Sequence, residues 1–242
     1  MKKKVVIGIL IVLIICLGIF LIVKTNSNKN IREDSIKFKE DYESYNGKSN
    51  QNDKKYRVVN INKDNPFVYK TEDEIVSMIN NKETFAVYFG FNTCPWCRSV
   101  IEELIKVSKD LSIDTIYYVN VRPNGVDIRD TITVNEDGTY ERTKEGTTGY
   151  NKLLELLSNV LSDYNLTDKD GNKIDVNEKR IYAPNVVSIV NGKAIKLETG
   201  IASNQSDAYM ELTDEMKKET YSKFESVLKE IKSGVCNAKE AC

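Results

Sequence analysis

The sequence contains no histidine among its 242 residues. This absence excludes histidine-based catalytic triads, histidine metal ligands and histidine proton shuttles. The chain also lacks an excess of charge of either sign, since 35 Lys and Arg residues face 36 Asp and Glu residues. Charge therefore gives no reason to expect a nucleic-acid partner. Cysteine, present five times, is left as the most reactive type of side chain, and we expect neither a cofactor nor a metal.

The one long apolar run lies near the N-terminus, at 5–23, directly after three lysines. At 1.5 Å per residue it would span about 28 Å, close to the thickness of a bilayer core. A cleaved signal peptide has a shorter apolar region and a small-residue cleavage site, and no such site follows this run. A lipoprotein signal would use Cys16, but Ile15 is too bulky for the position before a lipidated cysteine. We therefore predict a single-pass transmembrane anchor, with 1–4 in the cytoplasm and the rest of the chain outside it.

Polar residues dominate 24–55, where Asn, Lys, Ser, Asp and Glu are frequent. The simplest interpretation is a solvated linker that keeps the folded part clear of the membrane, with a weak helix between Ile31 and Tyr45. The folded domain is then expected at 56–235, and a cysteine-containing tail at 236–242.

Hydrophobic patterning in the first half of this domain alternates between strands and helices. The strands are predicted at 57–61, 67–69, 85–91 and 115–121, and the helices at 71–80 and 98–109. The strand–helix–strand order from 85 to 121 predicts a right-handed parallel unit.

The second half of the domain carries two hairpin signals. One hairpin is predicted around Asp137-Gly138, between strands 131–134 and 139–142, and the other around Asn191-Gly192, between strands 185–190 and 193–197. Helices are predicted at 150–164 and 214–233.

The most informative stretch joins the apolar strand 85–91 to Cys94-Pro95-Trp96-Cys97 at the start of a helix. A helix N-terminus offers unpaired N–H groups and the positive end of the helix dipole. Both favour a thiolate at Cys94, the more exposed cysteine, and should lower its pKa below the free value of about 8.5. Cys97 lies one turn further on, close enough to attack a mixed disulfide on Cys94. This arrangement predicts thiol–disulfide exchange.

Two other interpretations of the Cys94–Cys97 pair stay open, namely a structural disulfide and half of a zinc site. Zinc needs about four nitrogen or sulfur ligands, and the other pair outside the apolar run, Cys236 and Cys242, lies at the far end of the chain. Outside the cytoplasm that short-range pair is expected to form a structural disulfide, with a redox relay to or from Cys94 as the alternative. Trp96 is either a partly exposed substrate contact or part of the packing of the motif.

The order strand, Cys-x-x-Cys, helix, strand, then Pro184 before a β-hairpin and a terminal helix resembles the thioredoxin superfamily over about 56–233. Within it, the chain is similar to membrane-anchored thioredoxin-like proteins of Gram-positive bacteria, including the bacteriocin transport accessory group. The resemblance implies an α/β, thioredoxin-like fold, with a central mixed sheet flanked by helices and an insertion at about 122–180. It also implies that Pro184 is a cis-proline that packs beside the motif and presents backbone to an extended substrate, and that Ala183, just before it, helps to set redox selectivity. Together with Trp96, these two residues are the predicted substrate contacts.

The same resemblance makes Cys94 the attacking and Cys97 the resolving cysteine, but the chain departs from the family at several positions. Tyr88 stands where thioredoxins carry a buried acid, Thr93 replaces the flanking tryptophan, and the dipeptide between the cysteines is Pro-Trp rather than Gly-Pro. These departures argue against efficient reduction of the thioredoxin kind.

The sequence thus supports two hypotheses for function. The first is an extracytoplasmic, membrane-tethered thiol–disulfide oxidoreductase that acts on protein or peptide thiols and disulfides, with a membrane redox partner as a further candidate. The second is an accessory or binding protein for the secretion of a peptide such as a bacteriocin, with little redox turnover, for which the insertion would form a cap that recognises substrates. The direction of electron flow is left open by the sequence.

Overall fold

The structure, a computed structural model, describes residues 32–238, with the backbone alone for 234–238. It is a mixed α/β fold, and the part from Glu33 onward forms one compact unit. None of the helices in the described part is long and apolar enough to cross a membrane. The transmembrane anchor predicted at 5–23 lies outside the described residues.

A five-stranded mixed sheet organises this unit, in the strand order β1-β3-β2-β8-β9. Strands β1, β3 and β2 are parallel, whereas β8 runs antiparallel to β2 and β9 antiparallel to β8. The strands are β1 (Phe67–Tyr69), β2 (Phe85–Gly90), β3 (Ile116–Asn120), β8 (Asn185–Val190) and β9 (Lys193–Glu198). The predicted central mixed sheet, the parallel unit from 85 to 121 and the hairpin at Asn191-Gly192 are thereby confirmed.

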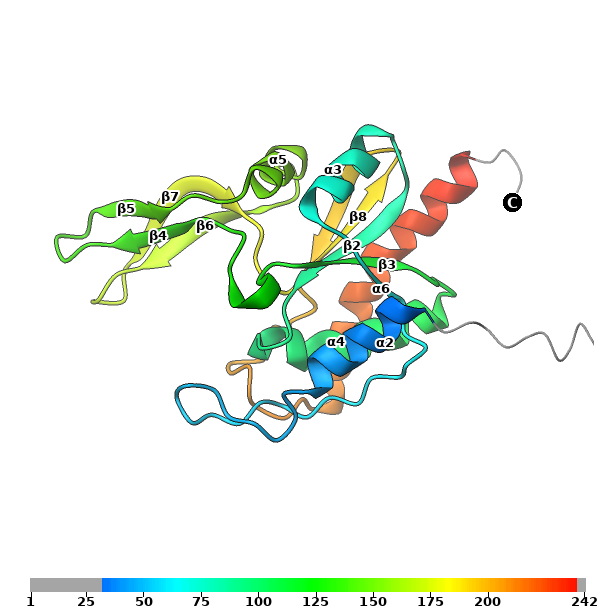
Figure 1. The fold of residues 1–242 in the computed structure, drawn as a ribbon, viewed down its shortest axis with the longest axis horizontal. Helices are drawn as coiled ribbons and strands as arrows, with labels where there is room; N and C mark the ends of the chain where they lie inside the picture. Colours follow the sequence, from blue (N-terminus) through cyan, green and yellow to red (C-terminus); the bar gives the residue numbers. More distant parts are fainter. Residues whose placement is uncertain (1–31, 239–242) are drawn as a thin grey trace, which may run out of the picture. The chain divides into compact units, whose positions relative to one another are not determined.

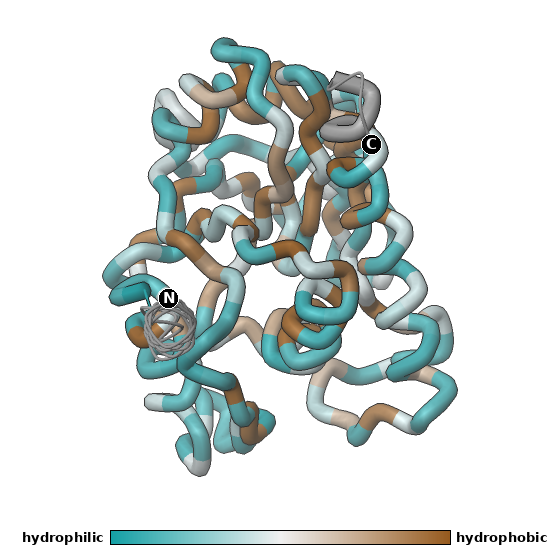
Figure 2. Tube along the Cα trace, turned by 90° about the vertical axis from the view of Figure 1, so that its right-hand side faces the viewer, coloured by the Kyte–Doolittle hydropathy of each residue, from teal (hydrophilic) through white to brown (hydrophobic). Residues whose placement is uncertain are grey.

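Helices cover both faces of the sheet (Figure 1). Helices α3 (Glu72–Asn80) and α5 (Thr148–Leu156) contribute to the hydrophobic cluster on one face, and α2 (Glu33–Glu43), α4 (Pro95–Asp110) and α6 (Asp214–Ala238) to the cluster on the other. Every residue of β2 is buried, because its alternate side chains enter these two clusters. Figure 2 shows hydrophobic and hydrophilic positions alternating along the surrounding helices, as one-sided packing requires.

Helix α2 confirms the weak helix predicted between Ile31 and Tyr45, but it corrects the prediction that 24–55 is a solvated linker. Phe38 and Tyr42 of this helix are fully buried, and the ring of Phe38 stacks on Phe67 of β1 with centroids 4.0 Å apart. The two aromatic residues stand four positions apart and so share one helix face. Apart from the partly exposed Ile36, the rest of the helix is polar. So narrow an apolar stripe gives little hydrophobic periodicity in the sequence.

The strand predicted at 57–61 is also wrong, since these residues form no strand. Val59 and Ile61 are nonetheless buried. Their backbone N–H groups bond to side chains instead of a neighbouring strand: Val59 donates to Asn46 at 3.0 Å and Ile61 to Glu43 at 2.8 Å. Side-chain acceptors from the preceding segment therefore replace the sheet ladder here.

The buried side chain of Arg98, in the first turns of α4, ties this preceding segment to the sheet. Its guanidinium donates to the carbonyl oxygens of Tyr42 at 2.7 Å, Arg57 at 2.6 Å and Asn92 at 3.1 Å. A buried guanidinium is tolerated only when its donors are satisfied. Arg98 thus joins the end of α2, the 57–61 stretch and the loop before the cysteine motif.

The predicted insertion at about 122–180 contains the short 3-10 helix η1 (Pro123–Gly125), α5 and two hairpins. The hairpins are β4 (Thr131–Val134) with β5 (Tyr140–Lys144), as predicted, and β6 (Ser162–Thr167) with β7 (Lys173–Arg180). We call residues 131–144 and 162–180 the arm, because the two hairpins project together away from the sheet (Figure 1). Asp130, 4% exposed, fastens the arm at its base through ion pairs with Arg142 and Arg180.

The helix predicted at 150–164 is shorter than expected, because α5 ends at Leu156 and Ser162 already begins β6. Leu157 and Leu161 remain buried in the turn that follows α5. Their apolar spacing therefore reflects core packing rather than a continuing helix. The last helix, α6, was predicted at 214–233 and extends to Ala238.

Candidate functional site

Both cysteines of the motif lie where strand β2 gives way to helix α4, as the sequence predicts. Cys94 is the N-cap of α4, and its sulfur accepts a 3.2 Å hydrogen bond from the backbone N–H of Cys97. Pro95 occupies the first turn, where the missing N–H costs no helical hydrogen bond. Both thiols are free, so the structure describes the reduced form of the pair.

The two thiols differ in exposure and in acidity. Cys94 is 4% exposed and Cys97 is fully buried. Burial alone would raise the pKa of Cys94, but hydrogen bonds from Cys97 and from the backbone of Trp96, together with the nearby Arg129 cation, hold that pKa below its ordinary value. Burial raises the pKa of Cys97 well above its ordinary value, and so does the hydrogen bond that it donates to Cys94. The expected acidic thiol is therefore Cys94.

The residues before β8 lie against the cysteine motif. The Cys94 thiol donates a 3.5 Å hydrogen bond to the carbonyl oxygen of Ala183, and the Ala183–Pro184 peptide bond is cis. Trp96 and Ala183 are partly buried and pack against the hydrophobic cluster that contains both cysteines. The predicted substrate-contact residues thus lie near Cys94 in space, although almost ninety residues separate Ala183 from Cys94 in sequence.

Arg129 is a site residue that the sequence analysis did not identify. It is 6% exposed, and its guanidinium forms a two-pronged contact with the Asp127 carboxylate, at 2.8 and 2.7 Å. Its Nη1 also donates to the carbonyl oxygen of Ile181 at 3.4 Å, so it contacts the same 181–184 segment that lies against Cys94. Arg129 and Arg122 together hold the pKa of Asp127 well below its usual range, against the opposing effect of burial. No sequence signal linked this arginine to a cysteine 35 residues earlier in the chain.

Tyr88 of β2 lies in the hydrophobic cluster on the face of the sheet that α2, α4 and α6 cover. It is fully buried, and its hydroxyl lies 3.1 Å from that of Tyr42. Tyr88 is one of the positions where the chain departs from the family, whereas Tyr42, in the predicted linker, carried no predicted role.

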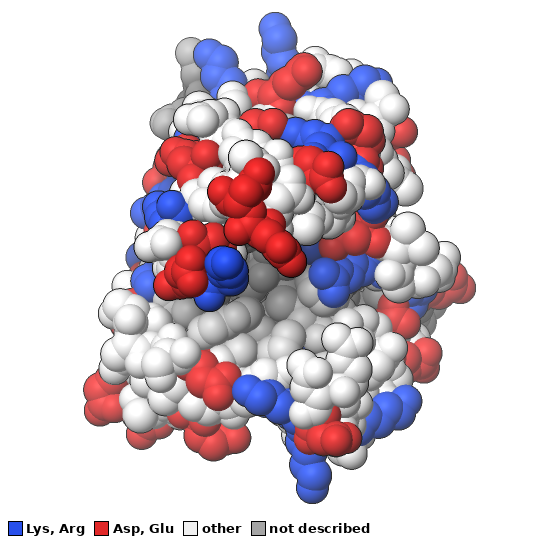
Figure 3. Space-filling model, turned by 90° about the vertical axis from the view of Figure 1, so that its left-hand side faces the viewer, with Lys and Arg blue, Asp and Glu red and all other residues white. Residues whose placement is uncertain are grey.

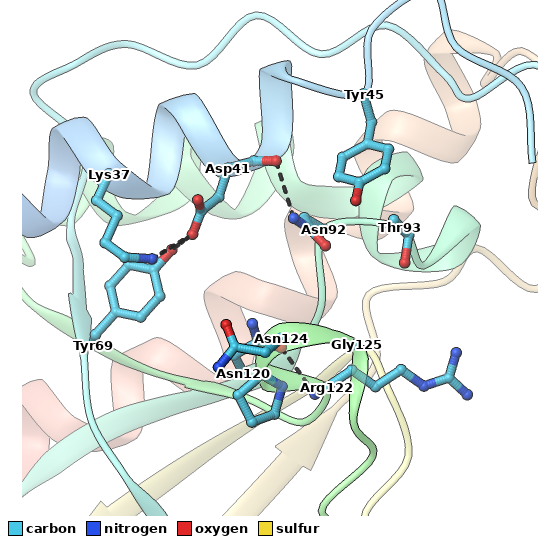
Figure 4. Close-up of a pocket in the computed structure, with 11 residues that line it drawn as sticks. Lys37, Asp41, Tyr45, Tyr69, Asn92, Thr93, Asn120, Arg122, Asn124 and Gly125 are labelled. Atoms are coloured by element: carbon cyan, nitrogen blue, oxygen red, sulfur yellow. Dashed lines mark hydrogen bonds and ion pairs between the residues drawn. The ribbon is translucent and has the colours of Figure 1, made fainter.

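A polar pocket of about 460 Å³ lies beside the motif and includes Thr93, the residue before Cys94, in its lining. Figure 4 shows Lys37 and Asp41 of α2 along one wall and Asn120 and Asn124 along the other. Figure 3 looks onto the side from which the arm projects, and this face is hollowed in its middle between acidic and basic side chains.

Among the side chains described, those of residues 32–233, no three or more His, Cys, Asp or Glu cluster in a way that could hold a metal ion. The disulfide predicted between Cys236 and Cys242 cannot be placed, because Cys242 lies outside the described residues and only the backbone is described at 236.

Comparisons with known proteins give no family for the chain. No family model, no curated protein and no solved structure matches it. Its function is therefore argued from the site itself.

Proposed function

We propose that this protein is a membrane-tethered thiol–disulfide oxidoreductase with a thioredoxin-like domain, acting outside the cytoplasm on protein or peptide thiols and disulfides. The observation that carries the proposal is the asymmetry of the cysteine pair. Cys94, at the helix N-cap, has a lowered pKa, and Cys97, buried one turn further on, has a raised one. Thiol–disulfide exchange needs this division of roles: one cysteine attacks as a thiolate, and the other stays protonated until it resolves the mixed disulfide.

Further support comes from the surroundings of the pair. Three parallel strands followed by an antiparallel hairpin, with helices on both faces, fit a thioredoxin-like domain. The apolar run at 5–23 after three lysines supports the membrane tether and the extracytoplasmic location. A redox partner in the membrane would then be close enough to restore the pair after each turnover.

In the reductive direction, the Cys94 thiolate attacks a substrate disulfide, and one substrate sulfur leaves as a thiolate. Cys97 then attacks the Cys94 sulfur, so that the Cys94–Cys97 bond forms and the bond to substrate breaks. The second substrate sulfur leaves and takes up the proton that Cys97 lost. The oxidative direction is the reverse, and the reduction potential of the pair against its surroundings decides between them.

Cys94→Ser tests this proposal, because it removes the attacking sulfur while keeping a small polar N-cap. The variant is expected to lose exchange with a model disulfide such as oxidised glutathione. Cys236→Ser combined with Cys242→Ser is the control, and it should retain exchange. Wild-type rates in Cys94→Ser would refute the assignment.

The near-complete burial of Cys94 favours a second candidate, an accessory protein for peptide secretion with little redox turnover. A sulfur that is 4% exposed is poorly placed for rapid exchange with large substrates. A reduction potential below about −300 mV for the Cys94–Cys97 couple would mark a bridge too stable to exchange and would favour this candidate.

A further inference from the structure

The polar pocket beside the motif lies at the carboxyl ends of the three parallel strands. Tyr69 ends β1, Asn120 ends β3, and Asn92 follows the end of β2 by two residues. All three residues line the pocket. The crevice outside the carboxyl ends of the strands is where open α/β sheets bind their ligands. With a volume of about 460 Å³, the pocket also falls within the roughly 300–1,000 Å³ range of small-ligand sites.

The pocket reaches the cysteine motif through Thr93, the residue before Cys94. Consecutive Cα atoms are about 3.8 Å apart. A peptide joined to Cys94 through its own cysteine would therefore have its neighbouring residues within reach of the pocket. The lining contains neither Ala183 nor Pro184, so the pocket is a different surface from the predicted substrate contacts before β8.

The three charged side chains of the lining already have partners. Lys37 and Asp41 form an ion pair at 2.6 Å, and the Tyr69 hydroxyl donates to the same Asp41 oxygen at 2.5 Å. Arg122 forms an ion pair with Asp127 at 2.8 Å. The lining therefore offers a ligand no unpaired charge, and a charged ligand would have to compete with these pairs.

Uncharged groups that can both donate and accept hydrogen bonds make up the rest of the polar lining. Within the described part of the chain, the hydroxyls of Tyr45 and Thr93 and the side-chain amide of Asn124 take part in no hydrogen bond. Figure 4 shows Tyr45 and Thr93 across the pocket from Asn120 and Asn124. Hydroxyls and amides of this kind are complementary to peptide groups and to the side chains of Ser, Asn and Gln.

We propose that this pocket is a substrate subsite, which binds an uncharged polar peptide segment next to the cysteine that reacts with Cys94. The inference rests on the proposed exchange function and gives it a substrate class, namely peptides in which Ser, Asn or Gln flank the reacting cysteine. Tyr45, Thr93 and Asn124 hydrogen-bond to that flank. An apolar flank would take the same groups out of water without replacing their hydrogen bonds, which costs free energy.

Exchange of the reduced full-length chain with a set of disulfide-linked peptide dimers tests the inference. The peptides differ only in the residues on both sides of their single cysteine, which are Ser and Asn, Leu and Val, two Glu or two Lys. Each rate is divided by the rate of the same peptide with dithiothreitol, which corrects for the intrinsic reactivity of its disulfide. The peptide with Ser and Asn is expected to react about fivefold faster than the other three, the gain for one net hydrogen bond.

Tyr45→Phe removes one hydroxyl of the pocket and keeps the ring, which lies edge-on to Tyr56 with centroids 5.4 Å apart. The variant should slow the reaction of the peptide with Ser and Asn about fivefold. It should slow the peptide with Leu and Val much less, because that flank makes no hydrogen bond to the lost group. The ratio of the two rates is therefore expected to fall towards one.

Asn124→Asp tests the pocket by a change of specificity, which a loss of folding would not produce. Asp tolerates the left-handed backbone of Asn124, where φ is +52°. The new carboxylate should raise the rate of the Lys peptide relative to the Glu peptide several-fold. Asn191→Asp is the matched control, because Asn191 also has a positive φ, +50°, and follows β8 at the opposite end of the sheet, beside the start of β2.

The reaction of the wild type with bis(2-hydroxyethyl) disulfide, which has no peptide groups, separates the two proposals. If this disulfide reacts, equal rates for the four peptides would overturn the inference alone. So would an unchanged ratio of Lys to Glu peptide in Asn124→Asp, or an equal change in Asn191→Asp. No reaction of the wild type with any of the disulfides would instead overturn the proposed function.

Discussion

The thiol of Cys94 donates a 3.5 Å hydrogen bond to the carbonyl oxygen of Ala183. This contact joins the N-terminus of α4 to the segment that leads into β8. The Cys94 sulfur thus has two hydrogen-bond partners: it accepts from the backbone N–H of Cys97 and donates to the carbonyl oxygen of Ala183, the residue before Pro184. A substrate sulfur bonded to Cys94 would replace the thiol proton at this position, beside the 183–184 backbone.

The lowered pKa of Cys94 predicts how its reactivity depends on pH. The thiolate is the reactive form, so alkylation of Cys94 by iodoacetamide should rise with pH and reach half its maximum below the pH of an ordinary cysteine. Cys97, with its raised pKa, should stay unmodified until strongly alkaline pH. Peptide mapping at a series of pH values would measure both, and equal modification of the two cysteines at neutral pH would contradict the expected asymmetry.

The cation of Arg129 contributes to that low pKa, so its removal should raise the pKa of Cys94. Arg129→Gln is expected to shift the alkylation profile of Cys94 to higher pH and to slow modification at neutral pH several-fold. Arg122→Gln is the matched control, since Arg122 pairs with the same Asp127 carboxylate but, unlike Arg129, is not among the groups that lower the Cys94 pKa. Identical profiles for the wild type and Arg129→Gln would rule out an electrostatic contribution from this residue.

Helix α2 is predicted to be part of the folded domain rather than of a tether. Phe38→Ala removes a fully buried ring and should lower the free energy of unfolding by about 3–5 kcal/mol. Ile36→Ala, on the same helix but 37% exposed, should change it by only about 0.5 kcal/mol. Urea unfolding followed by tyrosine and tryptophan fluorescence would compare the two variants. An unchanged free energy of unfolding in Phe38→Ala would mean that α2 belongs to a linker and not to the folded domain.

Gly90→Ala should destabilise the protein through Tyr88. The new methyl group would lie 2.4 Å from the Tyr88 oxygen, and we expect a loss of about 1–3 kcal/mol as the ring is displaced. The same substitution made in a Tyr88→Ala background should cost much less, because the ring is gone. A double-mutant cycle by urea unfolding measures this coupling, and additive losses would mean that the two positions do not interact.

Local signals in the sequence predicted the parts of the fold that depend on neighbours in the chain. The helix pattern at 71–80, the Asn191-Gly192 turn and the apolar strand before Cys94 each place their element correctly. The Cys-x-x-Cys spacing at a helix start likewise predicted where Cys94 and Cys97 lie and which of the two is more exposed.

The features that sequence reasoning missed depend on partners far away in the chain. Tyr42 is a core residue because it packs against residues far away in the chain, among them Tyr88, 46 positions later, and Tyr118. Arg98 has the sequence pattern of a polar residue on an amphipathic helix. Inside the domain, however, its guanidinium donates hydrogen bonds to the carbonyl oxygens of Tyr42 and Arg57. Arg129 lies in a polar insertion whose folding against Cys94 has no local signature.

Trapping with Cys97→Ser, which removes the resolving thiol, tests the exchange role of Cys94 most directly. The reduced variant, mixed with a disulfide-bonded peptide, should accumulate a stable mixed disulfide, and mass spectrometry should place it on Cys94. This adduct should be absent from Cys94→Ser and should disappear within the reaction time in the wild type. No adduct on Cys94, or an adduct located instead on Cys236 or Cys242, would contradict it.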